Sequence, residues 1–175
     1  KIWNMDIINI YDNSNKLFFI GGVVRDKLLG RESFDIDITY VGNAIEYCKK
    51  LGEVVRENPD FGTVRVNVNG KIVDFASTRC EKYDKKGHLP TITKIGCSLK
   101  EDVLRRDFTV NALALSVTTG KIVDYVSGQE DLKNGIIRAV GNPMERFSED
   151  ALRMMRAIRF SAQLDYTIEE NTFSS

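Results

Sequence analysis

The sequence contains few of the residues that build disulfide, zinc or membrane proteins. Among 175 residues there are three cysteines, three prolines and one histidine. Cys48, Cys80 and Cys97 are odd in number and lack the spacing of zinc ligands, so we expect reduced thiols rather than a disulfide framework or a structural zinc site. No apolar run approaches the ~20 residues of a membrane span, and no signal peptide is visible. These absences favour a cytoplasmic protein without a membrane partner.

The chain also lacks net charge, because 25 lysines and arginines balance 25 aspartates and glutamates. The chain therefore has no overall positive field that would indicate a nucleic-acid partner. Basicity is local instead, since the stretch from Arg138 to Arg159 holds five arginines and no lysine against three acids. The length suits one well-packed domain with a helical extension.

Hydrophobic periodicity and turn residues predict a small α+β domain in the first four fifths of the chain. Asn69-Gly70 is a strong two-residue turn signal between alternating strands. Ser98 with Glu101 three residues later predicts a capped helix. The expected elements are a strand at 16–21, a helix at 23–29, a strand at 35–41, a helix at 44–51, a hairpin at 64–77, a loop at 82–89, a helix at 98–105 and sheet-packing segments at 110–117 and 121–126.

From Phe147 onward the pattern becomes helical. Ser148 and Glu149-Asp150 open a helix whose apolar residues recur at three and four. Those residues are Ala151, Leu152, Met155, Ile158 and Ala162. We therefore divide the chain at about Pro143, into a domain at 1–142 and a helical segment at 143–175. The chain begins without methionine and stops as a new helix begins, so we expect it to be part of something longer.

Two aspartates, Asp35 and Asp37, are two residues apart in a predicted strand and so share one face. Two carboxylates so near to each other repel unless a cation lies between them. Such oxygen ligands suit Mg²⁺ that carries a nucleoside triphosphate. Asp74, on the returning strand of the hairpin, would join them if that strand lies beside 35–41. Two metals could then clamp the attacking and leaving oxygens of a phosphoryl transfer. The alternative for Asp74 is a solvated strand residue.

Glycines and arginines complete the candidate site. Gly21-Gly22, at the start of a predicted helix, lets backbone approach a phosphate closely. On a later helix, Asp150 and Arg153 share a face and together offer an acceptor and a forked donor to a base edge. The alternative is an i,i+3 ion pair on a solvated helix, and Arg159 could simply anchor that helix to the first domain.

Six segments, in this order, resemble the class II tRNA nucleotidyltransferases, which comprise the CCA-adding enzymes and the bacterial poly(A) polymerases. They are Gly21–Asp26, Asp35–Asp37, Val73–Arg79, Arg105–Ala112, Asp124–Leu132 and Glu149–Phe160. The resemblance runs from about Leu17 to the end. It implies a head domain of the DNA polymerase β-like nucleotidyltransferase fold (a small mixed sheet with helices) at 1–142 and an α-helical neck at 143–175. The family's body and tail domains are expected to be absent from this chain.

The same resemblance implies a role for each matching residue. Asp35 and Asp37 would hold Mg²⁺, and Asp74 would complete the catalytic carboxylates and help activate the RNA 3′-hydroxyl. Asp150 and Arg153 would act as a protein template that reads the Watson–Crick edges of CTP and ATP. The implied nucleotide-binding residues are Gly21, Gly22, Arg25, Arg106, Asp107, Asn111, Asp150, Arg153, Arg156 and Arg159.

The implied activity is addition of CMP, CMP and AMP to the 3′ end of tRNA, without a nucleic-acid template, by attack of the RNA 3′-hydroxyl on the α-phosphate. C and A both present an amino donor beside a ring-nitrogen acceptor, whereas U and G would leave the reading groups unpaired. The alternatives are an A-adding, CC-adding or poly(A) enzyme. A non-catalytic nucleotide- or RNA-binding module is a further alternative, which the three carboxylates disfavour.

Two local signals bear on the choice among these activities, and they disagree. Residues 40–44 resemble a subset that includes A-adding enzymes, whereas 149–156 resemble full CCA-adding enzymes. We give weight to the second, because it would contact the base. The full-length stretch between Arg79 and Arg105 argues against a CC-only enzyme.

Overall fold

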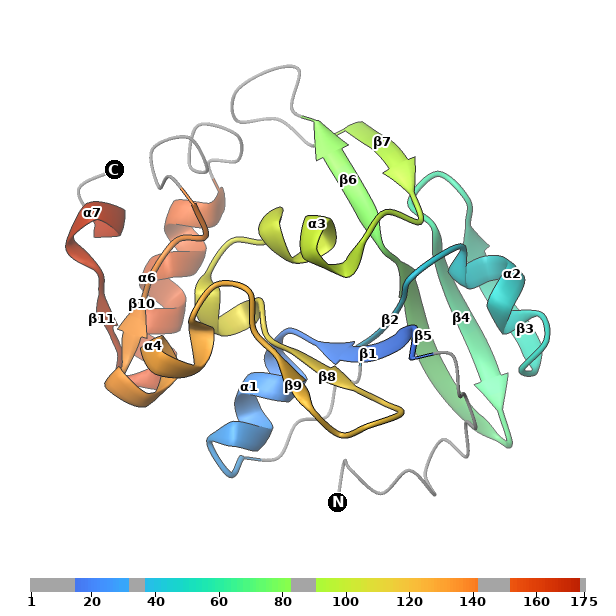
Figure 1. The fold of residues 1–175 in the computed structure, drawn as a ribbon, viewed down its shortest axis with the longest axis horizontal. Coiled ribbons are helices and arrows are strands. Elements are labelled where there is room, and N and C mark those ends of the chain that lie inside the picture. The colour runs from blue at the N-terminus through green and yellow to red at the C-terminus, as the bar shows by residue number, and fades with distance from the viewer. Residues whose placement is uncertain (1–14, 32–36, 83–90, 142–151, 174–175) are drawn as a thin grey trace.

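A computed structural model describes residues 15–31, 37–82, 91–141 and 152–173. Its centre is a seven-stranded sheet with the order β3-β4-β5-β2-β1-β8-β9 (Figure 1). The strands are β1 (Leu17–Ile20), β2 (Asp37–Tyr40), β3 (Glu53–Asn58), β4 (Thr63–Val68), β5 (Lys71–Ser77), β8 (Ala114–Ser116) and β9 (Ile122–Val123). Two small sheets pair β6 (Arg79–Lys82) with β7 (Thr91–Ile95) and β10 (Ile136–Ile137) with β11 (Thr167–Ile168). The helices are α1 (Gly22–Leu28), α2 (Ala44–Cys48), α3 (Leu99–Leu104), α4 (Gly128–Asn134), α6 (Leu152–Leu164), α7 (Glu170–Phe173) and the 3₁₀ turn η2 (Thr109–Asn111).

The central sheet is mixed, which confirms the predicted α+β class. β2 and β5 run parallel, whereas β1 pairs antiparallel with both β2 and β8. In Figure 1 the β6–β7 ribbon extends upward from the sheet, and α6 and α7 lie at the opposite end from β3 and β4. None of the helices in the described ranges is both long and apolar enough to span a membrane.

The β4–β5 hairpin forms as the turn residues predict. Asn69 and Gly70 both have positive φ, 51° and 84°, as a type I′ turn requires. The Asn67 side chain accepts a hydrogen bond from the Gly70 N–H at 2.9 Å, which secures the turn. The hairpin continues in register from Val68 and Lys71 at the turn to Thr63 and Ala76 at its far end.

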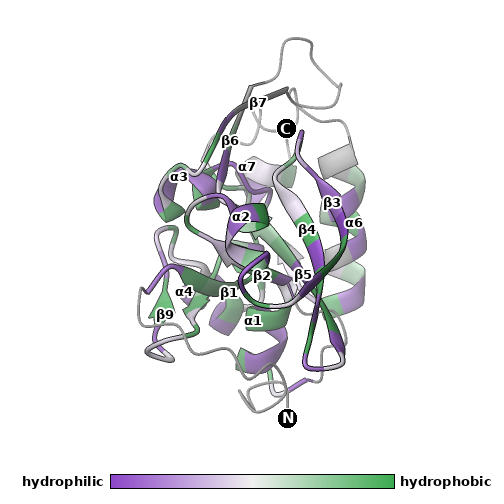
Figure 2. Ribbon diagram, turned by 90° about the vertical axis from the view of Figure 1, so that its right-hand side faces the viewer, coloured by the Kyte–Doolittle hydropathy of each residue, from purple (hydrophilic) through white to green (hydrophobic). Residues whose placement is uncertain are grey.

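The two faces of the sheet are covered differently. Phe19, Ile38 and Phe75 belong to a core cluster to which α1 and α2 contribute. On the other face Phe18 and Ile20 pack in a second cluster with residues of α3. Figure 2 shows β1 hydrophobic throughout, whereas the edge strand β3 is largely hydrophilic. The sheet is therefore apolar on both faces at β1 but not at its β3 edge.

Several elements were not predicted, and one predicted face was wrong. The sequence reading missed β3, β6, β7, β10, β11 and α4, while the expected loop falls mostly on residues 83–90, outside the described residues. The helix predicted after Phe147 is present as α6, but its Met155 and Ile158 are 67% and 59% exposed. Ala157 and Leu164, two turns apart, are buried instead, because α6 packs on β10 and β11 through this narrow face. The boundary near Pro143 lies outside the described residues and stays a prediction.

Candidate active site

Two of the three predicted carboxylates lie side by side. Asp37 on β2 is the in-register partner of Asp74 on β5, in the parallel part of the sheet. Neighbouring strands are about 4.8 Å apart and in-register residues point to the same face. Asp37 shares its face with Thr39, whose partner on β1 is Phe18, so both carboxylates lie on the α3 side. Asp35 falls outside the described residues.

Arg65 is part of this site, although the sequence analysis did not single it out. It faces Asp74 across the hairpin, with Nε donating to Oδ1 at 2.9 Å and the second nitrogen to Oδ2 at 3.3 Å. Hydrogen bonding to Asp74, and then its charge, raises the pKa of Arg65. An exposed ion pair adds little to stability, but the positive charge of Arg65 offsets the repulsion between Asp37 and Asp74. The two-residue turn fixes this register, so counting back from Asn69-Gly70 would have found it.

The predicted glycine turn, Arg25 and Asn111 lie together. Gly21 has a φ of 82° between β1 and α1, a conformation that favours glycine. Arg25 is buried and donates to the Asn111 side-chain oxygen at 2.7 Å. Its guanidinium lies beside Gly22, where a Cβ would be 3.4 Å from the nearer nitrogen. A cation is thus held against the turn that was predicted to receive phosphate.

Arg106 is held by Asp102, a second residue that the sequence analysis did not single out. Asp102 on α3 is completely buried and binds Arg105 and Arg106, each at 3.2 Å. It also accepts a hydrogen bond from the Arg79 backbone N–H at 2.9 Å. The spacing of three and four residues from Asp102 to the arginines was the available signal. This one carboxylate therefore fixes α3, β6 and the predicted nucleotide-binding arginine together.

Two buried donors in this region lack an acceptor within the described part of the chain. They are the Nε of Arg106 and the side-chain nitrogen of Asn111. Burial, more than any other cause, lowers the pKa of Arg106, while the charge of Asp102 raises it. Leaving buried donors unsatisfied costs free energy, so both groups favour a ligand rich in hydrogen-bond acceptors.

Asp107 joins the same segment to α6. Its Oδ2 lies 2.6 Å from an Arg156 nitrogen, and its Oδ1 accepts a hydrogen bond from the Phe108 N–H at 2.7 Å. Asp107 is 6% exposed, so the ion pair is buried at its acidic end. Arg153 lies one turn before Arg156 on α6, and Arg159 lies on the same helix with an exposed side chain. Asp150 is outside the described residues.

This pair leads to a prediction about how α6 is positioned. Arg156→Gln should destabilise the protein and so should Asp107→Asn, while the double variant should lose less than the sum of the two. We expect a coupling free energy on the order of 1 kcal/mol, because the two groups contact each other directly. Urea unfolding of the four proteins measures it, with Gln163→Ala on the exposed side of α6 as a control. Additive losses would show that the pair does not act as a unit.

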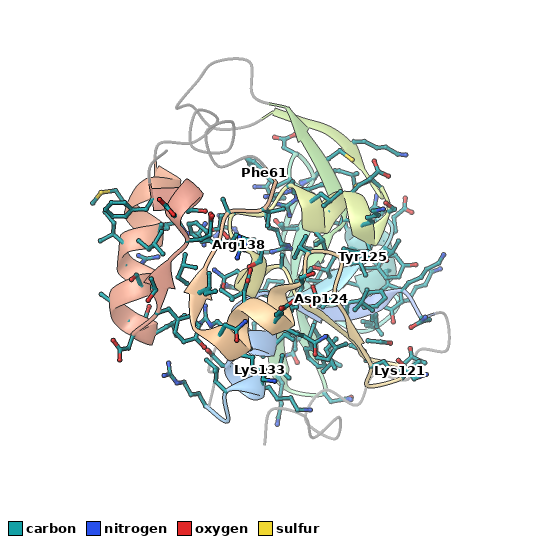
Figure 3. The ribbon with its side chains drawn as sticks, turned by 60° about the vertical axis from the view of Figure 1, so that its left-hand side comes forward. Phe61, Lys121, Asp124, Tyr125, Lys133 and Arg138 are labelled. Carbon is teal, nitrogen blue, oxygen red and sulfur yellow. The ribbon has the colours of Figure 1, made fainter. Side chains whose placement is uncertain are left out.

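Hydrogen bonds and an ion pair around α4 hold the segment that contains Thr109 and Asn111. Thr109 donates to Asp131 at 2.6 Å, and Arg138 binds the same carboxylate at 3.1 Å. Asp124 lies between β9 and α4 (Figure 3), and its carboxylate accepts backbone hydrogen bonds from Val126, Gly128 and Gln129. This network ties η2 to α4 and so fixes the position of Asn111 at the end of η2.

The fold is that of a nucleotidyltransferase head domain. The chain belongs to the Poly A polymerase head domain family, which matches residues 17–138. This family generally uses divalent metal ions. The family and the head fold expected from the six sequence segments are thereby confirmed.

Among curated proteins, the chain is 46% identical over 158 residues to the CCA-adding enzyme of Ligilactobacillus salivarius (strain UCC118), covering 90% of this chain and 39% of that enzyme. It is 41% identical over 164 residues to the A-adding tRNA nucleotidyltransferase of Aquifex aeolicus (strain VF5), covering 90% of this chain and 19% of that protein.

Solved structures agree with these relatives. The Bacillus stearothermophilus CCA-adding enzyme in complex with CTP matches with a TM-score of 0.76 at 36% identity, over 90% of this chain and 38% of that one. A tRNA nucleotidyltransferase complexed with a primer tRNA and an incoming ATP analog matches with a TM-score of 0.74 at 37% identity, over 90% and 43%. The chain thus spans less than half the length of each of these four relatives.

Proposed function

We propose that this chain is the catalytic part of a tRNA 3′-end nucleotidyltransferase that adds CMP, CMP and AMP from CTP and ATP. The observation that carries the proposal is the in-register pairing of Asp37 with Asp74 on parallel strands. Two exposed carboxylates side by side on one sheet face can hold metal ions for phosphoryl transfer, whereas a protein that only binds nucleotides has little need of them. Relatives named for CCA addition and a neighbour in complex with CTP support this substrate class. The cytoplasmic location expected from the sequence stays a prediction.

Mg²⁺ fits the residues present. The donors on this face are hard carboxylate oxygens, the ligands that Mg²⁺ prefers when it also binds a triphosphate. Asp37 would hold the ion, together with Asp35 as the sequence predicts. When bound, Mg²⁺ would neutralise charge on the triphosphate and favour departure of pyrophosphate.

The protein residues would divide the remaining work. Arg25 and the Gly21-Gly22 turn would hold the triphosphate, while Arg106 and Asn111 would donate the hydrogen bonds that no described residue accepts. Asp74 would accept a hydrogen bond from the RNA 3′-hydroxyl and orient its oxygen. That oxygen attacks the α-phosphorus and gives up its proton to Asp74, the bond from the α-phosphorus to the bridging oxygen breaks, and pyrophosphate leaves.

Base choice is proposed to depend on α6. Asp150 and Arg153 would read the nucleotide edge, and the ion pair between Asp107 and Arg156 would hold α6 in position. Rejection of U and G then follows from buried polar groups that they would leave unpaired. Replacing Arg153 should therefore relax base choice more than it weakens triphosphate affinity.

Extension of labelled tRNA with each single nucleotide and Mg²⁺ tests the activity. The substrates are tRNA lacking the whole CCA end and tRNA lacking only the terminal A. Ordered addition of C, C and then A would support the proposal. Failure on both substrates, with neither CTP nor ATP bound in calorimetry, would contradict it.

An A-adding specialist is the second candidate. The observation in its favour is the 41% identity to the A-adding tRNA nucleotidyltransferase of Aquifex aeolicus. Such an enzyme would extend only tRNA that already ends in CC, and only with ATP. The same extension assay therefore separates the two candidates.

A further inference from the structure

Two of the three cysteines, far apart in the sequence, meet beside a carboxylate outside the candidate active site. Cys80 lies on β6, Cys97 follows β7, and Glu101 lies in the first turn of α3. One potential ligand atom from each, two sulfurs and a carboxylate oxygen, lies within 4.8 Å of the others. The sequence spacing of the cysteines did not indicate that this pair would lie together. No disulfide joins the three cysteines, all of which the structure describes.

Hydrogen bonds to neighbouring residues hold these three residues in place. The Thr78 hydroxyl donates to the Cys97 carbonyl at 2.6 Å, and the Gly96 N–H donates to the Thr78 carbonyl at 2.7 Å. Next to Cys80, the Arg79 N–H is bound by Asp102 of α3. The strand that carries Cys80 is thus fixed both to the segment that carries Cys97 and to the helix that carries Glu101.

We infer that Cys80, Cys97 and Glu101, named here the thiol site, form a binding site for Zn²⁺ or another thiophilic divalent cation. Zinc binds thiolate sulfur at about 2.3 Å and carboxylate oxygen at about 2.0–2.2 Å in a tetrahedron, which places ligand atoms about 3.5–3.8 Å apart. The observed spacing needs only small side-chain movements to reach this geometry. Three protein ligands leave a fourth position for water or another donor.

Two of the three groups are thiols, which must lose their protons to bind a cation. The Cys80 thiol donates to Glu101 at 3.1 Å, so a proton now occupies the space between the donors. A bound cation would displace this proton and stabilise both thiolates. Cys97 is buried, whereas Glu101 is exposed and provides a route of entry.

The thiol site differs from the Mg²⁺ site in its ligand atoms and in the elements that carry them. Soft sulfur ligands select zinc-like ions, whereas the Asp37 and Asp74 face offers only oxygen. Glu101 also directly precedes Asp102, the buried anchor of Arg106. A cation here would join β6, the end of β7 and α3, and so stabilise the helix that positions this arginine.

Titration of the whole chain, purified metal-free under reducing conditions, with Cd²⁺ and Zn²⁺ tests the inference. We expect thiolate-to-cadmium charge-transfer absorption at one equivalent, and a higher unfolding temperature with Zn²⁺. Cys80→Ala and Cys97→Ala should each weaken binding about a hundredfold or more, since even outer-shell partners of metal ligands contribute about ten- to a hundredfold. Neither readout depends on nucleotidyl transfer.

The chain offers matched controls. Cys48→Ala removes a buried thiol at the end of α2 that belongs to the hydrophobic core, and it should leave Cd²⁺ binding unchanged. Glu101→Gln keeps the capping box with Ser98, because glutamine also serves at that position, yet it removes the carboxylate ligand and should weaken binding. Asp37→Asn should leave the cadmium signal intact. The inference is overturned if the unmodified chain gives no thiolate-to-cadmium absorption, or if Cys80→Ala and Cys97→Ala bind Cd²⁺ as Cys48→Ala does.

Discussion

Asp37→Asn is expected to lower nucleotidyl transfer about a thousandfold, which corresponds to about 4 kcal/mol of lost transition-state stabilisation. Asparagine has nearly the same shape as aspartate but lacks the negative charge that would hold Mg²⁺. Because Asp37 lies exposed at the start of β2, the fold should be preserved. Single-turnover extension of tRNA with CTP and ATP measures the loss, and circular dichroism checks the fold.

Triphosphate binding should survive this substitution in part, because Arg25 and Arg106 are unchanged. Glu57→Gln is the matched control, since Glu57 is an exposed acid on β3 that, like its cross-strand partner Val64, lies on the sheet face opposite to Asp37 and Asp74. It should transfer nucleotides at the normal rate. Near-normal turnover of Asp37→Asn would show that the metal assignment is wrong.

Asp102→Asn is expected to destabilise the protein on the order of 3 kcal/mol. The side chain is completely buried and binds Arg105 and Arg106, so losing its charge leaves two partly buried guanidinium groups without this ion-pair partner. The side-chain nitrogen of the new asparagine would also point at a hydrogen-bond donor, where the aspartate offered an acceptor. Urea unfolding measures the change in the free energy of unfolding.

The same substitution should weaken nucleotide binding, because Arg106 loses the group that positions it. Calorimetric titration with CTP and ATP checks this at a temperature where the variant is folded. Lys100→Ala, at an exposed position of the same helix, should change neither quantity. A variant as stable as the parent would mean that Asp102 does not anchor α3 to β6.

Local chemistry made part of the site predictable. The Asn69-Gly70 turn specifies a two-residue hairpin, and its register places Asp74 opposite Arg65. Ser98 and Glu101 form the capping box that the sequence indicated. These features depend on residues close in sequence, for which turn geometry and helix periodicity leave little freedom. The same periodicity would have shown Asp102 within reach of Arg105 and Arg106.

Long-range features were not predictable in this way. The buried face predicted for α6 was wrong. Met155 and Ile158 recur at helical spacing, but Ala157 and Leu164 are the residues buried where α6 packs on β10 and β11. Sequence periodicity identifies an apolar stripe but not the surface that covers it. The ion pair between Asp107 and Arg156 likewise joins residues far apart in the chain.

The sequence by itself determined the α+β class, the hairpin, the capped helix and the family, because these follow from local patterns and from six motifs in order. Only the tertiary structure decided that Asp37 faces Asp74, and that Cys80, Cys97 and Glu101 meet. Pairing between distant strands brings such residues together, and its register depends on the packing of the whole sheet rather than on any one segment.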